Sequence, residues 1–351
     1  MSRADRFLRA CRSLPVDCTP VWIMRQAGRY LPEYRAVRAK YKFLELCSTP
    51  DAACEVTLQP VELLGVDAAI LFSDILLICD AMGCRLILED EGPQFPDPIR
   101  SRADVDKLGV PDPELSLGYV MEAVRRIKKG LAGVVPLIGF SGAPWTLAAY
   151  MIEGKTSRSF EKAKAALLAD PALAEALLGK LADSITLYLN AQLAAGAQAL
   201  QIFDSWAGAL GPADYAVLGA PYIARIISGL KLDRHNPEPV IVFGVETGEL
   251  LGQLSRTGAD VVGVDWRVPL PEARRRTGPG VALQGNLDPA SLFLPIPLLE
   301  ERARTVLREA KAAGGGHVFN LGHGIMVGTP PEAAKALVDL VHRETAQPSV
   351  V

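Results

Sequence analysis

The chain has 351 residues, of which 49% are hydrophobic and 22% are charged. This composition excludes an intrinsically disordered protein, and the length fits either two ordinary domains or one large barrel. The net charge of −3 argues against a nucleic-acid-binding protein, which usually carries an excess of basic residues. The class of ligand must therefore be inferred from local groups of residues rather than from the overall charge.

Cysteine usage and hydropathy bear on the compartment. The six cysteines all lie in the first quarter of the chain and form no C-x-x-C pair, and the first ten residues carry charges instead of an apolar signal segment. We therefore expect reduced thiols and a cytoplasmic protein. Residues 130–152 are long enough to cross a bilayer. Because Pro136 and Pro144 interrupt them, we expect a strand, a loop and the start of a helix there, and no membrane contact.

Short apolar runs, most of them followed by a helical pattern, recur along the chain. Near-continuous hydrophobicity is typical of parallel strands that are buried on both faces. The predicted strands are residues 20–24, 67–72, 134–140, 199–203, 240–243, 260–264, 281–284 and 317–321. One predicted helix begins at Pro50 after Thr49 as N-cap and extends toward Gly65, and the others are residues 115–129, 171–195, 212–230, 292–312 and 331–344.

Eight strand–helix repeats without a linker predict a single (β/α)8 barrel that spans residues 1–351. Residues 85–100 predict a small hairpin excursion after the second strand rather than a barrel element. The alternative fold is a doubly wound open sheet. The glycine-rich fingerprints of nucleotide binding that often accompany that fold are missing from the sequence.

Polar residues follow several predicted strands, at the end of the barrel where catalytic groups gather. Arg25 and Arg29 follow the first strand and are four residues apart, so on a helical turn they would share a face and bind carboxylates. Asp74 follows the second strand, and its position alone fits a helix N-cap equally well. Three further candidates are Tyr150, Ser205 and His323. Each also has a purely structural interpretation: the tyrosine fits a helix core, the serine a helix cap and the histidine an exposed turn.

Residues that other reaction types require are missing from these positions. No lysine lies at a predicted strand end, and no cluster of His, Cys, Asp and Glu has the spacing of a metal site. Neither Ser141 nor Ser205 lies in a G-x-S-x-G turn. The remaining carboxylate, guanidinium, phenol, hydroxyl and imidazole groups predict binding of an anion-rich substrate and proton transfer without a metal or another cofactor.

Six motifs resemble those of the uroporphyrinogen decarboxylase family, in the same order along the chain. PVWIMRQAGRYLPEYR (residues 20–35) and GFSGAPWTLAAYMIEG (139–154) resemble its two signature segments. FSDIL (72–76), QIFDSWAG (201–208), QGNLDP (284–289) and NLGHGI (320–325) are similar to further segments of the family. One departure follows the last motif, where Met326 and Val327 stand in place of an aliphatic residue and often a proline.

This resemblance implies a (β/α)8 barrel that usually forms a homodimer. It implies conversion of the four acetate side chains of uroporphyrinogen III to methyl groups, which yields coproporphyrinogen III and CO₂ in porphyrin biosynthesis without a cofactor. Asp74, Arg25, Tyr150 and His323 are then the expected catalytic residues. Carried over position by position, the resemblance implies that the tetrapyrrole contacts Arg25, Gln26, Ala27, Gly28, Arg29, Asp74, Tyr150, Ser205 and His323.

The chemistry of the reaction agrees with these roles. Loss of CO₂ from an acetate on a pyrrole needs an electron sink, and protonation of a ring carbon creates a cationic ring that serves as one. Asp74 is expected to hydrogen-bond the pyrrole N–H groups and stabilise this charge, while Arg25 and Arg29 hold substrate carboxylates. Since a guanidinium is a poor acid, the proton donor stays open among His323, Tyr150, water and a substrate acetate.

Two other functions are compatible with the same kind of barrel. A zinc-dependent cobalamin methyltransferase needs His and Cys ligands near the end of the fifth strand, where this chain has the sequence VFGV (residues 242–245). A non-catalytic tetrapyrrole carrier is expected to lack Asp74 or Arg25, and both are present. The sequence therefore favours the decarboxylase.

Overall fold

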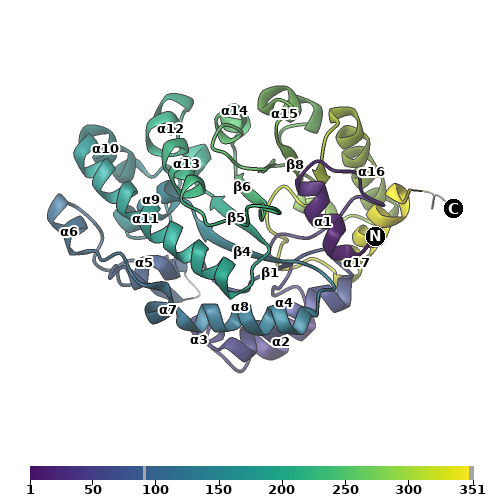
Figure 1. The fold of residues 1–351 in the computed structure, drawn as a ribbon, viewed down its shortest axis with the longest axis horizontal. Coiled ribbons are helices and arrows are strands. Elements are labelled where there is room, and N and C mark those ends of the chain that lie inside the picture. Colours follow the sequence, from purple (N-terminus) through teal and green to yellow (C-terminus); the bar gives the residue numbers. More distant parts are fainter. Residues whose placement is uncertain (90–91, 348–351) are drawn as a thin grey trace.

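The computed structural model describes residues 1–89 and 92–347. Seven parallel strands form one curled sheet in the order β1–β4–β5–β6–β7–β8–β9, and helices cover its outside (Figure 1). Two further strands, β2 and β3, pair antiparallel to each other. The strands are β1 (Ala69–Ile70), β2 (Ile87–Glu89), β3 (Gly92–Gln94), β4 (Leu137–Gly142), β5 (Ala199–Asp204), β6 (Val240–Gly244), β7 (Val261–Gly263), β8 (Ala282–Gln284) and β9 (His317–Val318).

The helices lie mostly between consecutive strands, as expected when parallel strands need crossover connections. They are α1 (Arg3–Cys11), α2 (Pro32–Arg38), α3 (Phe43–Ser48), α4 (Pro50–Leu64), α5 (Leu77–Ala81), α6 (Arg102–Lys107), α7 (Pro113–Ser116), α8 (Gly118–Leu131), α9 (Pro144–Glu153), α10 (Glu161–Ala169), α11 (Pro171–Ala195), α12 (Pro212–Leu218), α13 (Ala220–Ser228), α14 (Leu251–Leu254), α15 (Leu270–Thr277), α16 (Ile296–Ala313) and α17 (Pro331–Thr345), with 3-10 turns η1 (Ala207–Ala209), η2 (Gly248–Leu250) and η3 (Pro289–Phe293).

The first predicted strand, residues 20–24, is reduced to a single bridge between Val21 and Phe319. Its backbone still bonds to both sides, because Phe319 N–H donates to Pro20 O at 2.8 Å and Asp67 N–H donates to Val21 O at 2.8 Å. The Val21 N–H donates to the Asp67 carboxylate instead of a backbone carbonyl. A side chain thus replaces part of the ladder, and the segment lies between β9 and β1 without being a regular strand. With this correction, the predicted α/β barrel is confirmed.

The other predicted barrel strands correspond to β1 and β4–β9. The predicted helix 115–129 is interrupted at Leu117, between α7 and α8. Helix α11 has the predicted bounds, but the predicted helix 212–230 breaks at Gly219 into α12 and α13. A Cβ at Gly219 would lie 2.8 Å from Tyr215 Cζ, so glycine lets the tyrosine ring lie close to the break. Thr49 occupies the N-cap of α4, but its hydroxyl donates to Glu45 O at 2.7 Å and does not cap the helix.

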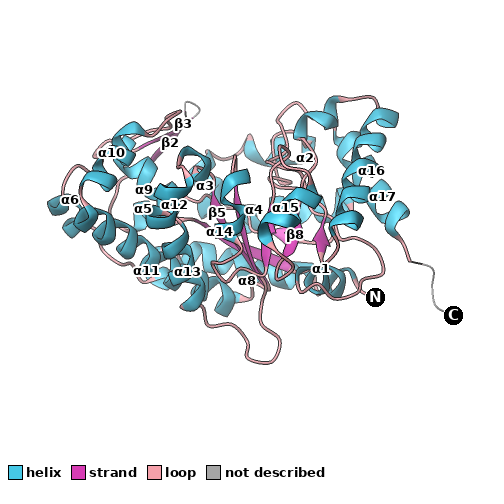
Figure 2. Cartoon of the chain, turned by 90° about the horizontal axis from the view of Figure 1, so that it is seen from above, coloured by secondary structure: helices cyan, strands magenta, loops and turns pink. Residues whose placement is uncertain are grey.

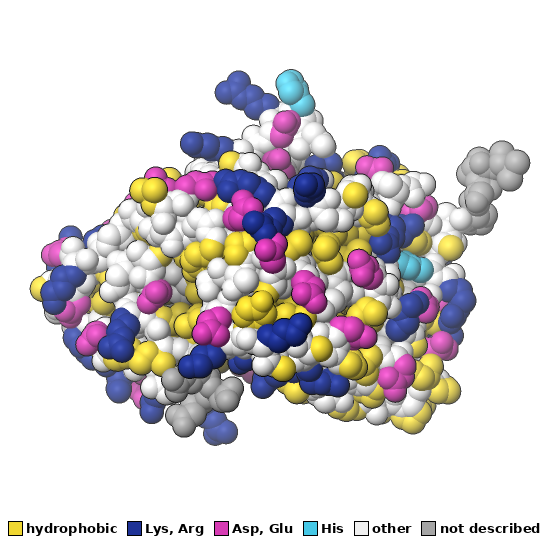
Figure 3. All heavy atoms as spheres, turned by 90° about the horizontal axis from the view of Figure 1, so that it is seen from below, with side chains coloured by type: hydrophobic (Ala, Val, Ile, Leu, Met, Phe, Trp, Pro, Cys, Tyr) yellow, Lys and Arg dark blue, Asp and Glu magenta, His cyan; other side chains and the backbone are white. Residues whose placement is uncertain are grey.

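The apolar segment 130–152 is confirmed as a broken one, since it holds the end of α8, strand β4 and most of α9. Within the described part of the chain, no helix combines the length and apolar character needed to cross a membrane. On the face shown in Figure 3, acidic and basic side chains are interspersed. This mixture agrees with the small net charge.

The interior of the barrel is packed rather than hollow. Trp22 Nε1 donates to Gln284 Oε1 at 2.9 Å, and Gln284 Nε2 donates to Gln201 Oε1 at 3.1 Å, all at completely buried positions. Helix α1 contacts β8 and β9, whereas β2 and β3 stand at the upper edge of the molecule in Figure 2, at a distance from α1. Strands β2 and β3 belong to the predicted hairpin excursion, and residues 90 and 91 of it lie outside the described residues.

Candidate active site

A cavity of about 520 Å³ lies at the carboxyl ends of the barrel strands. Its wall combines polar groups with many aromatic and aliphatic side chains, as is typical of small-molecule sites. The structure brings together residues from segments that lie far apart along the chain. Of the residues predicted to contact substrate, those that line this cavity are Arg25, Ala27, Gly28, Arg29, Asp74, Tyr150, Ser205 and His323.

Gln26 is the predicted residue that does not line the cavity. Its side-chain Oε1 accepts the Ile23 N–H at 3.0 Å, and its Nε2 donates to Ala68 O at 3.0 Å. The Tyr30 hydroxyl donates to Gln26 O at 2.9 Å. With 1% of its surface exposed, Gln26 fixes the loop that carries the two arginines and is turned away from the cavity.

Arg25 and Arg29 reach the same cavity through a series of turns, so the expected helical turn is wrong. Arg25 has a φ of 63°, a left-handed conformation that is unusual outside glycine. A Cβ on Gly28 would lie 2.8 Å from Arg25 O, so the return of the chain needs glycine there. Both arginines are exposed, and neither forms an ion pair within residues 1–89 and 92–347. Their guanidinium groups therefore have no carboxylate partner in the described residues.

The loop after β9 makes room for Arg25. A Cβ on Gly324 would lie 2.8 Å from Arg25 Cγ and 2.9 Å from Arg25 Nε. Two hydrogen bonds tie the loops together, since Ile325 N–H donates to Met24 O at 2.9 Å and Met24 N–H donates to Asn320 Oδ1 at 3.0 Å. The side chain of Arg25 therefore occupies the space that the Cβ of any residue other than glycine would fill at position 324.

Asp74 lines the cavity and does not cap α5, whose N-cap residue is Leu76. Its Oδ1 accepts the Leu76 N–H at 2.8 Å, a local hydrogen bond in the turn before the helix. In the described chain no other hydrogen bond or ion pair involves this carboxylate, so the second oxygen is left for a ligand in the cavity. Burial raises the pKa of Asp74, while the Leu76 N–H and the charge of Arg25 oppose this shift.

His323 and Tyr150 are both held in their neutral forms. The His323 Nδ1 accepts the Gly324 N–H at 2.6 Å, which places the proton of the neutral ring on Nε2. Burial, together with the charges of Arg25 and Arg267, lowers the pKa of His323 to about 4. Burial also raises the pKa of Tyr150, whose ring packs edge-on against Trp206 at 5.9 Å. At neutral pH both side chains are hydrogen-bond donors without charge.

Comparison with known proteins agrees with this geometry. The family model described as uroporphyrinogen decarboxylase (URO-D) matches residues 2–344. The uroporphyrinogen decarboxylase of Myxococcus xanthus is 57% identical over 97% of this chain and 96% of its own length. That of Vibrio cholerae is 52% identical over 96% of each. The chain belongs to the uroporphyrinogen decarboxylase family. The prediction made from the six motifs, that of a decarboxylase of porphyrin biosynthesis, is therefore confirmed.

The solved structures show the fold beyond this family. A methyltransferase from Methanosarcina mazei has a TM-score of 0.81 and 20% identity, over 98% of this chain and 99% of its own. At this level of identity the likeness concerns the fold alone. The sequence lacks the His and Cys expected of a zinc-dependent methyltransferase at residues 242–245. Residues 242–244 form the end of β6, and Val245 follows the strand and lines the cavity.

The site residues predicted from the family motifs do not include most of the apolar side chains that line the cavity. Trp206, Phe203 and Phe243 line the cavity next to predicted site residues. The signal was available, because Phe203 and Phe243 end predicted strands and Trp206 follows Ser205 in the motif QIFDSWAG. Tyr34 and Phe43 also line the cavity and pack against Phe72 with ring centroids 5.7 and 5.9 Å apart.

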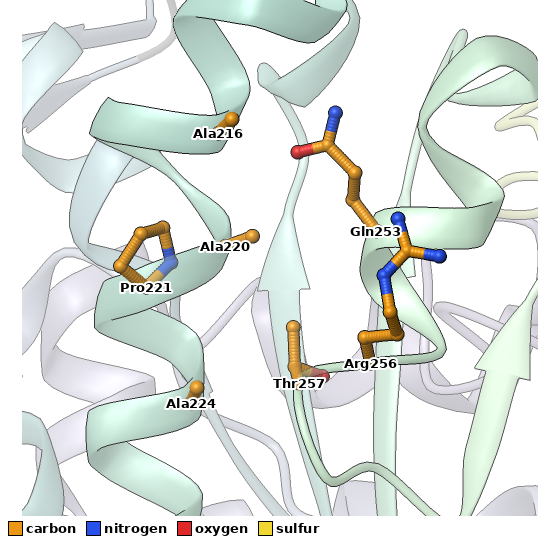
Figure 4. A pocket seen from close by; sticks show the side chains of 7 residues that line it. All are labelled: Ala216, Ala220, Pro221, Ala224, Gln253, Arg256 and Thr257. Carbon is orange, nitrogen blue, oxygen red and sulfur yellow. The ribbon is translucent and has the colours of Figure 1, made fainter.

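A second hollow, of about 430 Å³, lies on the outer helical layer between α12, α13 and α14 (Figure 4). Its wall consists mainly of small side chains, with Gln253 and Arg256 on one side. Gln253 Nε2 already donates to Pro212 O at 2.8 Å. None of the predicted site residues of the family lies there, so we assign no part of the reaction to this hollow.

Proposed function

We propose that this chain removes the acetate carboxyl groups of uroporphyrinogen III in the cavity at the barrel mouth and produces coproporphyrinogen III. The observation that carries this proposal is the carboxylate of Asp74, which lines the largely apolar cavity together with two arginines and forms no ion pair with either of them in the described residues. A lone anion in such a place suits a ligand that presents N–H groups and becomes cationic during the reaction.

The two arginines bind and orient the substrate. A tetrapyrrole with eight carboxylates needs positive partners, and each guanidinium can hold a carboxylate through two parallel hydrogen bonds. Arg35 supports this by donating to Arg29 O at 2.8 Å and Tyr30 O at 3.1 Å, which stabilises the loop from outside. The binding energy of the carboxylates then serves to place the reacting pyrrole against Asp74.

Asp74 stabilises the charge that forms on the pyrrole. Protonation of the ring carbon next to the acetate makes the ring cationic, and the bond between the acetate methylene and its carboxylate then breaks. Its electron pair neutralises the ring and CO₂ leaves. A proton added to the methylene carbon forms the methyl group, and loss of the proton that the ring carbon had gained restores the neutral pyrrole. The apolar surroundings of Asp74 strengthen its attraction for the cationic ring because they lower the local dielectric.

The neutral donors on the wall complete the site. His323 offers Nε2–H, and Tyr150 and Ser205 offer hydroxyl groups, to substrate carboxylates. With a pKa of about 4, His323 holds a carboxylate by hydrogen bonding and is not the imidazolium that would supply a proton at neutral pH.

The whole chain acts as one catalytic barrel domain, and we propose a cytoplasmic homodimer. Phe293, Met326 and Val327 are 49, 48 and 54% exposed, and the last two also line the cavity. A second copy that covers these apolar side chains would close the mouth of the cavity. Sedimentation at micromolar concentration tests this, and a monomer at all concentrations would contradict it.

The proposed cytoplasmic location rests on the cysteines. Six free cysteines support a reducing compartment.

The decisive experiment is anaerobic incubation of the purified chain with uroporphyrinogen III. We expect release of CO₂ and a succession of porphyrinogens that ends with four remaining carboxylates, measured by chromatography of the oxidised porphyrins. Saturable binding without CO₂ release would instead identify a tetrapyrrole carrier and refute the proposed reaction.

A further inference from the structure

A buried network of hydroxyl groups and one carboxylate lies behind the wall of the cavity that carries Ser205 and Trp206. Asp204, the last residue of β5, has no exposed surface. Its Oδ1 accepts a hydrogen bond from Thr146 Oγ1 at 2.7 Å, and its Oδ2 accepts one from Tyr215 Oη at 2.9 Å. Thr146 belongs to α9 and Tyr215 to α12, and both are completely buried. The carboxylate thus joins three elements.

The direction of these hydrogen bonds is fixed by the carboxylate. An ionised carboxylate only accepts, so the single hydroxyl proton of Thr146 points to Asp204. The Thr146 oxygen is then left to accept, and it accepts the N–H of Trp206 at 3.1 Å. The Trp206 carbonyl is held as well, because Trp145 Nε1 donates to it at 2.8 Å. Both backbone polar groups of Trp206 are therefore bonded to residues at the start of α9.

This arrangement reaches the cavity through Trp206. The Trp206 ring lies 5.9 Å from the ring of Tyr150 and 4.7 Å from that of Phe160. Its indole Nε1 is buried and has no hydrogen-bond partner among residues 1–89 and 92–347, although Trp206 lines the cavity. A buried donor without a partner is unfavourable, so the surrounding structure must hold the ring in place. Ser205 and Tyr150 line the same cavity.

We propose that Asp204, Thr146 and Tyr215 are positioning residues that hold Ser205 and Trp206, and through the Trp206 ring Tyr150, in the arrangement that binds the reacting tetrapyrrole. The inference rests on the proposed decarboxylation. None of the three lines the cavity, so they act through the backbone of residues 205 and 206 rather than on the substrate. A merely structural network has no need of a charged acceptor, since well-packed apolar side chains stabilise a core equally well.

The test is a double-mutant cycle on the intact chain, with uroporphyrinogen III as substrate under anaerobic conditions. Thr146→Val removes the hydroxyl while nearly preserving its shape, and Asp204→Asn replaces an acceptor-only group by one that also donates. We expect each to lower kcat about tenfold while KM changes less than about threefold, because alignment is lost rather than charge attraction. The double variant should lose no more than either single variant, since all of them interrupt the same hydrogen bond.

Asp260→Asn provides a control for the same chemical change at a site outside the network. Asp260 is an exposed aspartate, and its Oδ2 accepts the Val240 N–H at 2.8 Å at the opposite end of the barrel strands. We expect this variant to change the melting temperature without lowering kcat. If Asp204→Asn does not fold, the kcat of Thr146→Val decides, and Tyr215→Phe serves as the second variant of the cycle.

The outcomes are distinguishable. A folded Thr146→Val chain with the wild-type kcat, additive losses in the double variant, or an equal loss in Asp260→Asn would each overturn the positioning role. An inactive wild-type chain that binds the substrate would instead overturn the proposed function itself. Lower kcat in the network variants, with non-additivity and an active control, would establish the network as part of the catalytic apparatus.

Discussion

Replacement of Gly324 by alanine perturbs the site through a single carbon atom. The Cβ of Gly324→Ala would lie 2.8 Å from Arg25 Cγ and 2.9 Å from its Nε, which is closer than non-bonded heavy atoms pack. Because the position of Cγ is set by the first side-chain torsion, Arg25 has to change its rotamer. The φ of Gly324 is not among the left-handed values, so alanine itself is compatible with the backbone.

The expected loss concerns activity rather than folding. Displacement of a substrate-positioning group by about 1 Å can cost about 10²-fold in rate. At 1.36 kcal/mol for each factor of ten, this amounts to about 2.7 kcal/mol of transition-state stabilisation. Because Arg25 is exposed and forms no ion pair within the described residues, its movement should change the free energy of unfolding by less than about 1 kcal/mol.

The assay is anaerobic turnover of uroporphyrinogen III, with thermal unfolding followed in parallel. Gly328→Ala in the same loop is the control, since its Cβ would lie 3.4 Å from Phe293 Cε1, an ordinary contact. We expect kcat/KM to fall about a hundredfold in Gly324→Ala and to stay within about twofold of the wild type in Gly328→Ala. Wild-type kcat/KM in Gly324→Ala would show that the reaction does not depend on the placement of Arg25.

Four further predictions concern single groups. Asp74→Asn should fold normally but lose about 10²–10³ in kcat, and normal turnover would remove Asp74 from the mechanism. In the wild type, kcat should decline on acidification from a pH above the ordinary aspartate range, because burial raises the pKa of Asp74 and protonation abolishes its charge. Arg29→Lys should raise KM about tenfold with little change in kcat, since an ammonium group lacks the planar fork; an unchanged KM would contradict this role. His317, whose Nε2 donates to Gly285 O at 2.7 Å, has its pKa lowered to about 4 by burial. In the unfolded chain this imidazole is protonated at a higher pH than in the folded chain. The free energy of unfolding should therefore decrease by about 3 kcal/mol as the pH falls from about 6.5 to 4. Chemical denaturation of His317→Gln at several pH values should lack this component, and equal pH dependence in both chains would refute the assignment.

Several features of this chain follow from local sequence. The apolar runs predict where strands lie because a parallel strand buried on both faces needs apolar residues throughout. Pro171 and Gly196 mark the ends of α11, since proline suits a first helical turn and Gly196 adopts a φ of 121°. The placement of Asp74 and His323 directly after predicted strands also follows, because the barrel directs all such positions to one end.

Tertiary structure decided what depends on contacts between distant segments. Arg25 requires the absence of a side chain at Gly324, and no local pattern connects these two positions. Gln26 lies between two arginines of the cavity but is turned inward, because the loop carries a left-handed residue and its polar partners belong to Ile23 and Ala68. The first strand lost its regular ladder because a buried carboxylate from before β1 took one of its bonds. Local propensity indicates the elements of a barrel, whereas close approach across its mouth determines which polar atoms remain available for chemistry.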